Sequence, residues 1–310
     1  GRRHEGHLGA RIMLSRTADH LFWMARYTER AENTARMLDV SLQTSLLPQS
    51  SASVELLWRG ILGICELQSQ YEARFQRLAA EQVMAFMATD PSNASSICSC
   101  LRAARENARA VRGKLTTEVW ETTNSTWLEL RGQMASAGRS PSRFFDWVKH
   151  RSHLARGVMI GTMLQDEALH FSRLGTFLER ADNTARILDV RYHALAGQGA
   201  PDTDAQPDDA RDDHMDFYHW AAVLRSVSAF EIYRKVYSDA ITPARVAELL
   251  ILRPDMPRSL LACMNEVVAN LDHVRNDHSR ETERRAGQLR ADLGYGRIDG
   301  ILQSGLHAYL

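Results

Sequence analysis

The sequence predicts an all-α protein made of two similar antiparallel helical bundles packed as one unit. Three observations predict this fold class. The chain repeats itself, helix-capping residues with Gly or Pro beyond them recur along its length, and no segment shows the alternating Val, Ile and Thr pattern of strands. An apolar content of 44% with 25% charged residues is that of a globular protein that buries a core.

The repeat is clearest in two stretches of seventeen residues. Residues 24–40 read MARYTERAENTARMLDV and residues 174–190 read LGTFLERADNTARILDV, with ten of the seventeen positions identical. The shared residues are mostly polar, whereas a purely structural repeat is expected to keep its apolar face and let its charges vary. The sequence therefore predicts a tandem duplication in which the polar residues themselves matter.

The duplication continues beyond this motif, with an offset of 150 that becomes 162 and then 163. The 12 extra residues fall in 197–213, whose Pro, Gly and Asp content predicts a flexible solvated loop. We expect one repeat over 13–156, a second over 157–310, and an upstream extension or expression remnant over 1–12. The pairs that set the later offsets are Trp58 with Trp220, Tyr71 with Tyr233, Pro91 with Pro254, Cys100 with Cys263, Asn107 with Asn270 and Arg112 with Arg275.

Helix start and stop signals place the elements in order. In the first repeat they predict helices over 15–46, from 93 or 95 to 112, from 116 or 117 to 133, and over 142–156. A capping box of Thr162 and Gln165 predicts the second motif helix, ending near 196 before Gly197. Further helices are expected near 215–236, 243–252, 258–277 and 281–292.

Charge and composition exclude several classes of function. The formal net charge is zero, so no overall field favours nucleic acid or an anionic membrane. No apolar run approaches the ~20 residues of a membrane span, and the N-terminus lacks the order of a secretory signal. Four scattered cysteines are typical of a reduced, cytoplasmic protein. The sequence leaves the oligomeric state open, and a homo-oligomer is one possibility.

One half of the first motif helix is rich in carboxylate and guanidinium groups, since a turn of about 100° per residue brings its polar side chains to one side. Three explanations stay open: a solvated surface with ion pairs along the helix, a polar network where the two copies meet, and a ligand site in which Arg binds an anion. The ligand-binding candidates are Glu29, Arg30, Asn33, Arg36, Glu179, Arg180, Asn183 and Arg186.

A second polar cluster occurs in the first repeat. Arg105, Arg109 and Arg112 are spaced to share one helix face, and the second repeat keeps only Asn270 and Arg275 of this set. Either two helices pair Arg with Glu here, or the first repeat alone supplies an asymmetric binding cleft. The further ligand-binding candidates are Arg105, Asn107, Arg109 and Arg112.

Neither a metal nor a cofactor is expected. Glu167 and His170 have the spacing that places two ligands on one helix face in di-iron bundles, and Asp216 and His219 are spaced similarly. A di-iron site needs two such pairs and two more carboxylates, but the first repeat has Thr17 where the second has Glu167. No Gly-rich phosphate loop or His-Glu-x-x-His sequence occurs, and nothing places a Ser/His/Asp or Cys/His relay.

Four stretches identify a family by resemblance: Met13-Leu14-Ser15-Arg16, YTERAENTAR at 27–36, RENAR at 105–109 and LERADNTAR at 178–186. Together they resemble the bacterial alpha-E family over nearly the whole chain. The resemblance implies a duplicated helical protein named for its Glu-Arg pairs, here Glu29-Arg30 and Glu179-Arg180. It also implies gene neighbours or fusion partners: a circularly permuted ATP-grasp ligase, a transglutaminase-like protein and Ntn-type peptidases.

The family context therefore suggests a role in peptide synthesis or modification, and three functions are weighed. The first is a non-catalytic accessory protein whose Arg, Glu and Asn faces hold a carboxylate-bearing peptide or dock the ligase. The second is an enzyme of the same pathway that uses Glu29 or Glu179 as general base, with Arg stabilising an anion. The third is a structural or oligomeric scaffold. The sequence ends at 306–310, where the family is expected to continue, so the resemblance also suggests that the final helix is shortened or absent.

Overall fold

The computed structural model describes residues 13–196 and 209–310, and in these ranges every regular element is a helix and none is a strand. The predicted all-α class is thus confirmed.

We call α1 to α7 the first copy and α8 to α15 the second. The first copy contains α1 (Ser15–Ser45), α2 (Ser51–Ile64), α3 (Gln68–Glu72), α4 (Ala80–Ala88), α5 (Ile97–Ala110), a 3-10 turn (Arg112–Lys114), α6 (Thr117–Ala137) and α7 (Pro141–Thr162). The second contains α8 (Glu167–Ala196), α9 (Asp209–Ser226), α10 (Phe230–Tyr237), α11 (Pro243–Leu252), α12 (Leu260–His273), α13 (Arg280–Tyr295), α14 (Ile298–Ser304) and α15 (Leu306–Tyr309).

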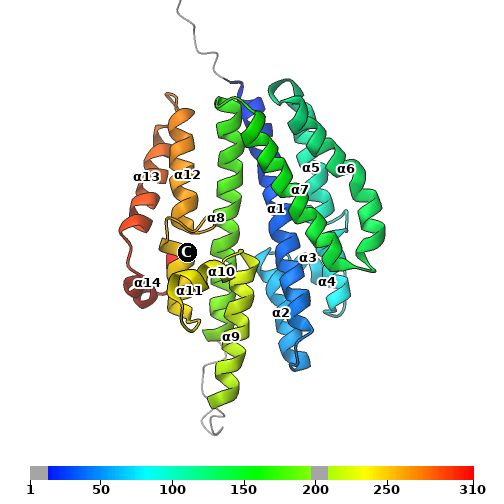
Figure 1. Cartoon of the computed structure of the whole chain (residues 1–310), viewed down its shortest axis with the longest axis vertical. Helices are drawn as coiled ribbons and strands as arrows, with labels where there is room; N and C mark the ends of the chain where they lie inside the picture. Colours follow the sequence, from blue (N-terminus) through cyan, green and yellow to red (C-terminus); the bar gives the residue numbers. More distant parts are fainter. Residues whose placement is uncertain (1–12, 197–208) are drawn as a thin grey trace, which may run out of the picture.

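The two motif helices, α1 and α8, run side by side through the middle of the molecule and in the same direction (Figure 1). Their starts lie together, because the backbone N–H of Met13 donates to Glu167 at 2.9 Å. α5 and α7 pack against α1, with α6 outside them, while α12 packs against α8, with α13 outside it (Figure 1). The polar faces of both motif helices are therefore turned inward, and α1 is buried on most of its sides.

Gly175 allows the two motif helices to approach closely. A Cβ atom at this position would lie 2.1 Å from the carbonyl oxygen of Phe22 on α1, which is far inside van der Waals contact. Small residues let helix backbones pass at short range, so Gly175 fixes how near α8 comes to α1. This spacing brings the Glu and Arg side chains one turn further along within reach of the opposite helix.

The two copies repeat individual contacts as well as sequence. His20 accepts or donates a hydrogen bond with Asn107 at 2.8 Å, and His170 makes the same bond with Asn270 at 2.8 Å. Equivalent helices of the two copies also end with a non-glycine residue in the left-handed region, Glu66 (φ 56°) after α2 and Ser228 (φ 55°) after α9. Matching backbone bonds close both turns, from Leu67 to Leu62 and from Ala229 to Leu224.

Two large apolar clusters and one smaller cluster stabilise this arrangement. Trp58, Phe86 and Phe144 lead the cluster of the first copy, and Trp220 and Tyr233 lead that of the second. All five are at most 1% exposed. Because large aromatic side chains bury the most area, these residues anchor each bundle beside its motif helix. A smaller cluster packs the starts of α1 and α8 against α7.

Several predicted helix ends are wrong. The cap of α8 is Asp166, whose carboxylate accepts from the backbone N–H of Ala168 at 3.0 Å, rather than the predicted box of Thr162 and Gln165. Thr162 instead ends α7, which runs six residues past the predicted end at Arg156. A capping residue stands directly before the first turn of its helix, and Asp166 has that position before α8. Thr162 is the last residue of α7 and is therefore too far from the start of α8 to cap it.

Other corrections concern helix starts. Ser96, not residue 93 or 95, caps α5 by accepting from the N–H of Ser99 at 3.2 Å. The predicted helix over 215–236 is two helices, α9 and α10, because the left-handed turn at Ser228 interrupts it. Residues 209–213 of the predicted loop belong to α9, while 197–208 and the predicted extension over 1–12 lie outside the described residues. Within the described ranges, no helix has both the length and the apolar character for crossing a membrane.

Candidate functional site

The two Glu-Arg pairs exchange partners between the copies. Arg180 donates to Glu29 from Nε at 3.0 Å and from Nη2 at 3.2 Å, and Arg30 donates to Glu179 from Nε at 2.6 Å and from Nη2 at 2.9 Å. Both pairs are bidentate, which gives strength and fixes orientation. Glu29 and Glu179 are 1% and 4% exposed, so this reciprocal exchange lies inside the protein.

We define the Glu29 site as the side chains gathered around Glu29 and Glu32. Arg258, from the loop before α12, donates to Glu29 at 2.9 Å, to Glu32 at 2.6 Å and to the amide oxygen of Asn33 at 2.9 Å. The Arg258 side chain is 8% exposed. Its guanidinium thus joins three residues of α1 from the second copy, which the sequence motif alone does not indicate.

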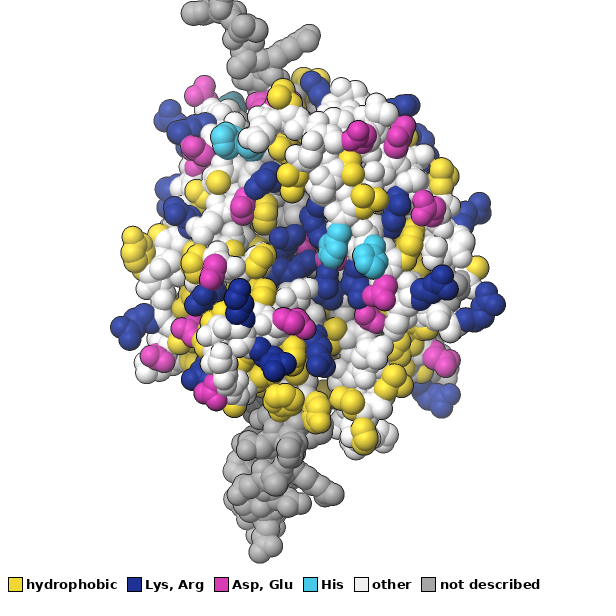
Figure 2. All heavy atoms as spheres, in the orientation of Figure 1, with side chains coloured by type: hydrophobic (Ala, Val, Ile, Leu, Met, Phe, Trp, Pro, Cys, Tyr) yellow, Lys and Arg dark blue, Asp and Glu magenta, His cyan; other side chains and the backbone are white. Residues whose placement is uncertain are grey.

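α7 supplies the outer wall of the Glu29 site. Arg156 donates to Glu29 at 2.8 Å and also binds Glu32, while the ring of His153 lies 3.3 Å from Glu32. Arg36 donates to Glu32 at 2.7 Å, and its Nε has no hydrogen-bond partner. Figure 2 shows Lys and Arg side chains gathered in a hollow at the centre of this face, with carboxylates among them.

The Glu29 site carries more positive than negative charge. Its four guanidiniums, from Arg36, Arg156, Arg180 and Arg258, surround two carboxylates, so the group has a formal charge of 4 − 2 = +2. Three of the arginines keep some exposure, between 11% and 21% of the side chain. Guanidiniums in excess at a partly open position are the arrangement that binds a carboxylate or phosphate.

The electrostatics of this site oppose a general base. Burial alone would raise the pKa of Glu29, but the charges of Arg180 and Arg258 outweigh it and lower the pKa. Burial is likewise outweighed at Glu32, where the His153 hydrogen bond and the Arg258 charge hold the pKa well below its usual range. A carboxylate with a lowered pKa is a weaker base, so the site favours holding charge over moving protons.

The Glu179 site lies between α1 and α8, next to the end of α2 and the loop before α5. Arg26 donates to Glu179 at 2.7 Å in addition to Arg30. Asp182 accepts from Arg186 at 2.9 Å, and Arg186 also pairs at 2.9 Å with Glu66, whose side chain is 75% exposed. The ion pairs of this site therefore run from a buried end at Glu179 to an open end at Glu66.

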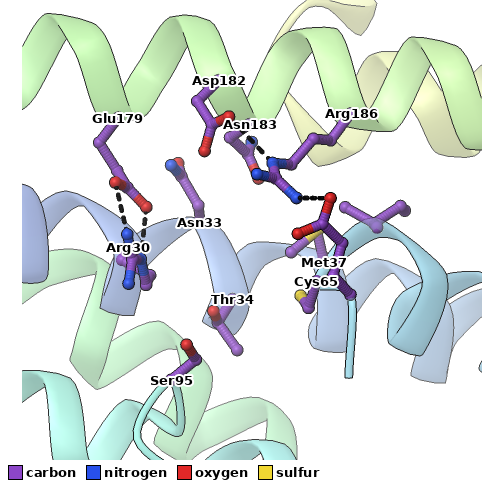
Figure 3. Close-up of a pocket in the computed structure, with 12 residues that line it drawn as sticks. Arg30, Asn33, Thr34, Met37, Cys65, Ser95, Glu179, Asp182, Asn183 and Arg186 are labelled. Atoms are coloured by element: carbon purple, nitrogen blue, oxygen red, sulfur yellow. Dashed lines mark hydrogen bonds and ion pairs between the residues drawn. The ribbon is translucent and has the colours of Figure 1, made fainter. Parts of the chain in front are cut away.

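A pocket of about 210 Å³ lies within the Glu179 site (Figure 3). Asn33 and Asn183 both line it, and each has a buried side-chain nitrogen with no hydrogen-bond partner. The other lining residues come from α1, α8, the end of α2 and the loop before α5: Arg30, Thr34, Met37, Ile64, Cys65, Glu66, Ser95, Glu179, Asp182 and Arg186.

The second polar cluster is not brought to this pocket. Arg105 donates to Asn124 of α6 at 2.9 Å, and Asn107 bonds His20. Arg109 is 66% exposed beside Glu106 of its own helix, and Arg112 lies 5.2 Å from the ring centre of Trp120. Each of the four candidates thus has a local contact within the first copy, and none of them lines the pocket.

The residues weighed for metal and nucleophile chemistry have other contacts. Glu167 accepts from the Met13 backbone and His170 bonds Asn270. Asp216 lies outside the described side chains. In the part of the chain that is described, no group of three or more His, Cys, Asp and Glu could hold a metal ion. Burial raises the pKa of the Cys65 and Cys263 thiols to about 12, so both stay protonated.

Sequence reasoning missed several residues of these sites, and the basic ones among them are Arg26, His153, Arg156 and Arg258. All lie outside the polar residues that the two copies share, which were the basis for selecting candidates. One signal could have found Arg258, because the offset of 163 pairs it with Ser95. Both residues stand just before a helix, but the second copy has a long cation there and the first copy has a small residue.

Fold and site together define a class of all-α protein in which two tandem copies exchange Glu-Arg ion pairs along a central pair of helices. The chain belongs to the Alpha-E family, described as a predicted alpha-helical domain with a conserved ER motif, and the match covers residues 13–310. Glu29-Arg30 and Glu179-Arg180 fit that motif. No curated protein and no solved structure matches the chain.

Proposed function

We propose that this protein is a non-catalytic binding component that holds a carboxylate-bearing peptide at the Glu29 site. The observation that supports this proposal is the excess of four guanidiniums over two carboxylates, with Arg36, Arg156 and Arg180 partly exposed. The unpaired Nε of Arg36 is one donor with no acceptor in the protein. A peptide carboxylate would supply acceptors for such donors.

The resemblance suggests the setting for this activity, a bacterial peptide synthesis or modification system around a circularly permuted ATP-grasp ligase. In that setting the protein would present the carboxylate that the ligase activates, or would dock the ligase itself. The lowered pKa values of Glu29 and Glu32 favour binding over the alternative of an enzyme with a Glu base. The alternative of a structural scaffold accounts for the ion pairs between the copies, but it does not explain the excess positive charge of the Glu29 site.

Calorimetry with short peptides tests the proposal. We expect a peptide with a free C-terminal carboxylate to bind the full chain, and the same peptide with a C-terminal amide to bind at least about tenfold more weakly, because the amide removes the charge that the guanidiniums recognise. Arg156→Gln, at the open edge of the site, should weaken binding of the carboxylate peptide by a similar factor. Equal binding of both peptides would refute a carboxylate site.

A matched control uses Arg105→Gln. Arg105 is also a partly exposed arginine, 23% exposed, but it contacts Asn124 and Glu106 away from the Glu29 site. Its replacement should leave peptide affinity unchanged. Co-purification with a circularly permuted ATP-grasp ligase from the same cells tests the partner separately, and ligase retention by the Arg156→Gln variant would assign docking to another surface.

A further inference from the structure

The two copies differ at one position that decides how their equivalent sites are filled. The offset of 163 pairs Arg258 with Ser95, and each stands directly before the capping serine of its helix, Ser259 of α12 and Ser96 of α5. Arg258 reaches into the Glu29 site and is nearly buried there. Ser95 ends after its hydroxyl, so the Glu179 site receives no such side chain.

The pocket in the Glu179 site lies where an arginine lies in the other copy. Arg258 binds Glu29, Glu32 and Asn33, and the offset of 150 converts these three into residues that all line the pocket. These equivalents are Glu179, Asp182 and Asn183. Figure 3 shows them along one wall of the pocket, with Ser95 on the other side.

A backbone contact also indicates that the pocket corresponds to the position of Arg258. The carbonyl oxygen of Arg258 accepts from the hydroxyl of Thr184 at 2.9 Å. The equivalent of Thr184 is Thr34, which lines the pocket next to Ser95 (Figure 3). The pocket therefore has the acidic and amide groups that hold a guanidinium in the second copy, together with the threonine that holds the carbonyl oxygen of the same residue.

Two further observations indicate that a ligand completes the pocket. Asn33 and Asn183 are 2% and 8% exposed, and the Nδ2 of each is buried without a partner. Buried donors are normally paired, so these two amide nitrogens indicate that an acceptor oxygen of a ligand binds here. The charged lining residues are three carboxylates, Glu66, Glu179 and Asp182, and two guanidiniums, and Arg26 binds Glu179 from outside the lining. The formal charge of this group is 3 − 3 = 0, so it lacks the positive excess of the Glu29 site that would repel a cation.

We propose that this pocket binds the guanidinium of an arginine supplied by a ligand, held between Glu179 and Asp182 as Arg258 is held between Glu29 and Glu32. The amide oxygen of Asn183 would accept from it as that of Asn33 does from Arg258. A carbonyl or carboxylate oxygen of the same ligand residue would accept from Thr34 and from the free amide nitrogens. This site is separate from the proposed carboxylate site and stands or falls independently of it.

The source of the arginine is either the free amino acid or an arginine residue of a peptide. Isothermal calorimetry on the full chain with L-arginine and with Nα-acetyl-L-arginine amide distinguishes them. L-citrulline, which has nearly the same shape without the charge, is the control probe. We expect one of the arginine probes to bind with one site per chain and citrulline to bind at least about tenfold more weakly. The tighter probe identifies the source.

Two variants test the position of the site. Ser95→Arg introduces the side chain that the second copy has, and it should fill the pocket and abolish arginine binding while keeping the helical circular dichroism signal. Ser95→Ala, the matched control, should bind normally. Asp182→Asn, at a side chain that is 38% exposed and thus tolerant of change, should weaken binding about tenfold even if Ser95→Arg folds poorly.

The outcomes are separable. Loss of binding in Ser95→Arg and Asp182→Asn, with normal binding in Ser95→Ala, supports the pocket. Equal binding of citrulline and arginine, unchanged binding in Ser95→Arg, or no binding of either arginine probe at millimolar concentration overturns it. These results are independent of the proposed carboxylate site, because Nα-acetyl-L-arginine amide has no carboxylate and L-citrulline has the same carboxylate as L-arginine.

Discussion

Glu29 and Arg180 form a bidentate ion pair between the two copies, and its twofold equivalent joins Glu179 to Arg30. The Glu-Arg sequence thus works as a cross-connection: each glutamate binds the arginine that follows the other glutamate. This relationship excludes the interpretation of a solvated helix face, since Glu29 is 1% exposed. It leaves a network between the copies, and both of the sites proposed to bind ligands adjoin this network.

Replacing one glutamate of this exchange should destabilise the protein strongly. In Glu179→Gln, Arg26 and Arg30 lose their shared carboxylate in a buried setting, which costs about 3–5 kcal/mol. Since one kcal/mol shifts Tm by roughly 2–4 °C at this size, calorimetry should show Tm lower by about 6–20 °C. Glu55→Gln is the control, because Glu55 and its partner Arg59 are 54% and 48% exposed. An equally small change in both variants would mean that the exchange contributes no stability.

Gly175→Ala should separate the motif helices. The added Cβ would lie 2.1 Å from the Phe22 carbonyl oxygen, so α8 must shift, and overpacking of this kind costs typically about 1–3 kcal/mol. Gly132→Ala in α6 provides the control, since nothing lies within 4 Å of its Cβ and alanine favours a helix by about 1 kcal/mol. Urea titrations should therefore move the midpoint down in one variant and slightly up in the other. A stable Gly175→Ala protein would argue against close contact of α1 and α8.

The stability of the protein should fall on acidification. Glu29 and Glu32 have folded pKa values below the ordinary 4.5, because the charges of nearby arginines outweigh the effect of burial. A lowered folded pKa means that the carboxylates contribute fully above pH about 4.5 and lose that contribution as the pH falls through the folded values. The free energy of unfolding should thus decline below pH about 4.5.

Variants assign this acid sensitivity. Glu32→Gln removes one of the two carboxylates and should make the decline below pH about 4.5 shallower. Asp255→Asn is the comparison, because Asp255 also has a pKa lowered by its hydrogen bond to Arg253 but is a surface group screened by water. It should leave the acid limb nearly unchanged. The same slope in Glu32→Gln as in the parent protein would assign the acid sensitivity to other carboxylates.

How far the sequence predicted this structure is clear from particular residues. The repeat and the helix signals predicted the all-α fold, and the α11 bounds of Pro243 and Leu252 were predicted to the residue. The identity of the polar residues shared by the copies pointed to Glu29 and Glu179. What the repeat could not supply was the rotation of α1 relative to α8, because the period of one helix does not determine which neighbour its polar side meets.

The remaining site residues were missed for a related reason. Arg258 and Arg156 reach the Glu29 site from a loop and from α7, at sequence separations of 229 and 127 residues. Such contacts depend on tertiary packing and leave no local pattern. Comparing the copies for what they share selected the common network, whereas the pocket follows from a difference, Ser95 against Arg258. The helix break at Ser228 was missed because a non-glycine residue adopts the left-handed conformation there.

Arg258→Ser should reproduce in the Glu29 site the situation that Ser95 creates in the Glu179 site. Loss of the guanidinium removes three hydrogen bonds and leaves Glu29 and Glu32 with fewer partners in a buried position, so Tm should fall. Agmatine, which carries a guanidinium on a short chain, should enter the vacated space. It should therefore raise the Tm of Arg258→Ser more than that of the parent protein.

N-carbamoylputrescine, the urea analogue of agmatine, is the control compound, because it keeps the ammonium group and the shape of agmatine but has an uncharged head group. It should raise neither Tm. Ligand binding stabilises the folded state by RT ln(1 + [L]/Kd), so the rise in Tm should grow with agmatine concentration. If agmatine raises the Tm of both proteins equally, the space left by Arg258 does not accept a guanidinium, and the correspondence between the two sites fails with it.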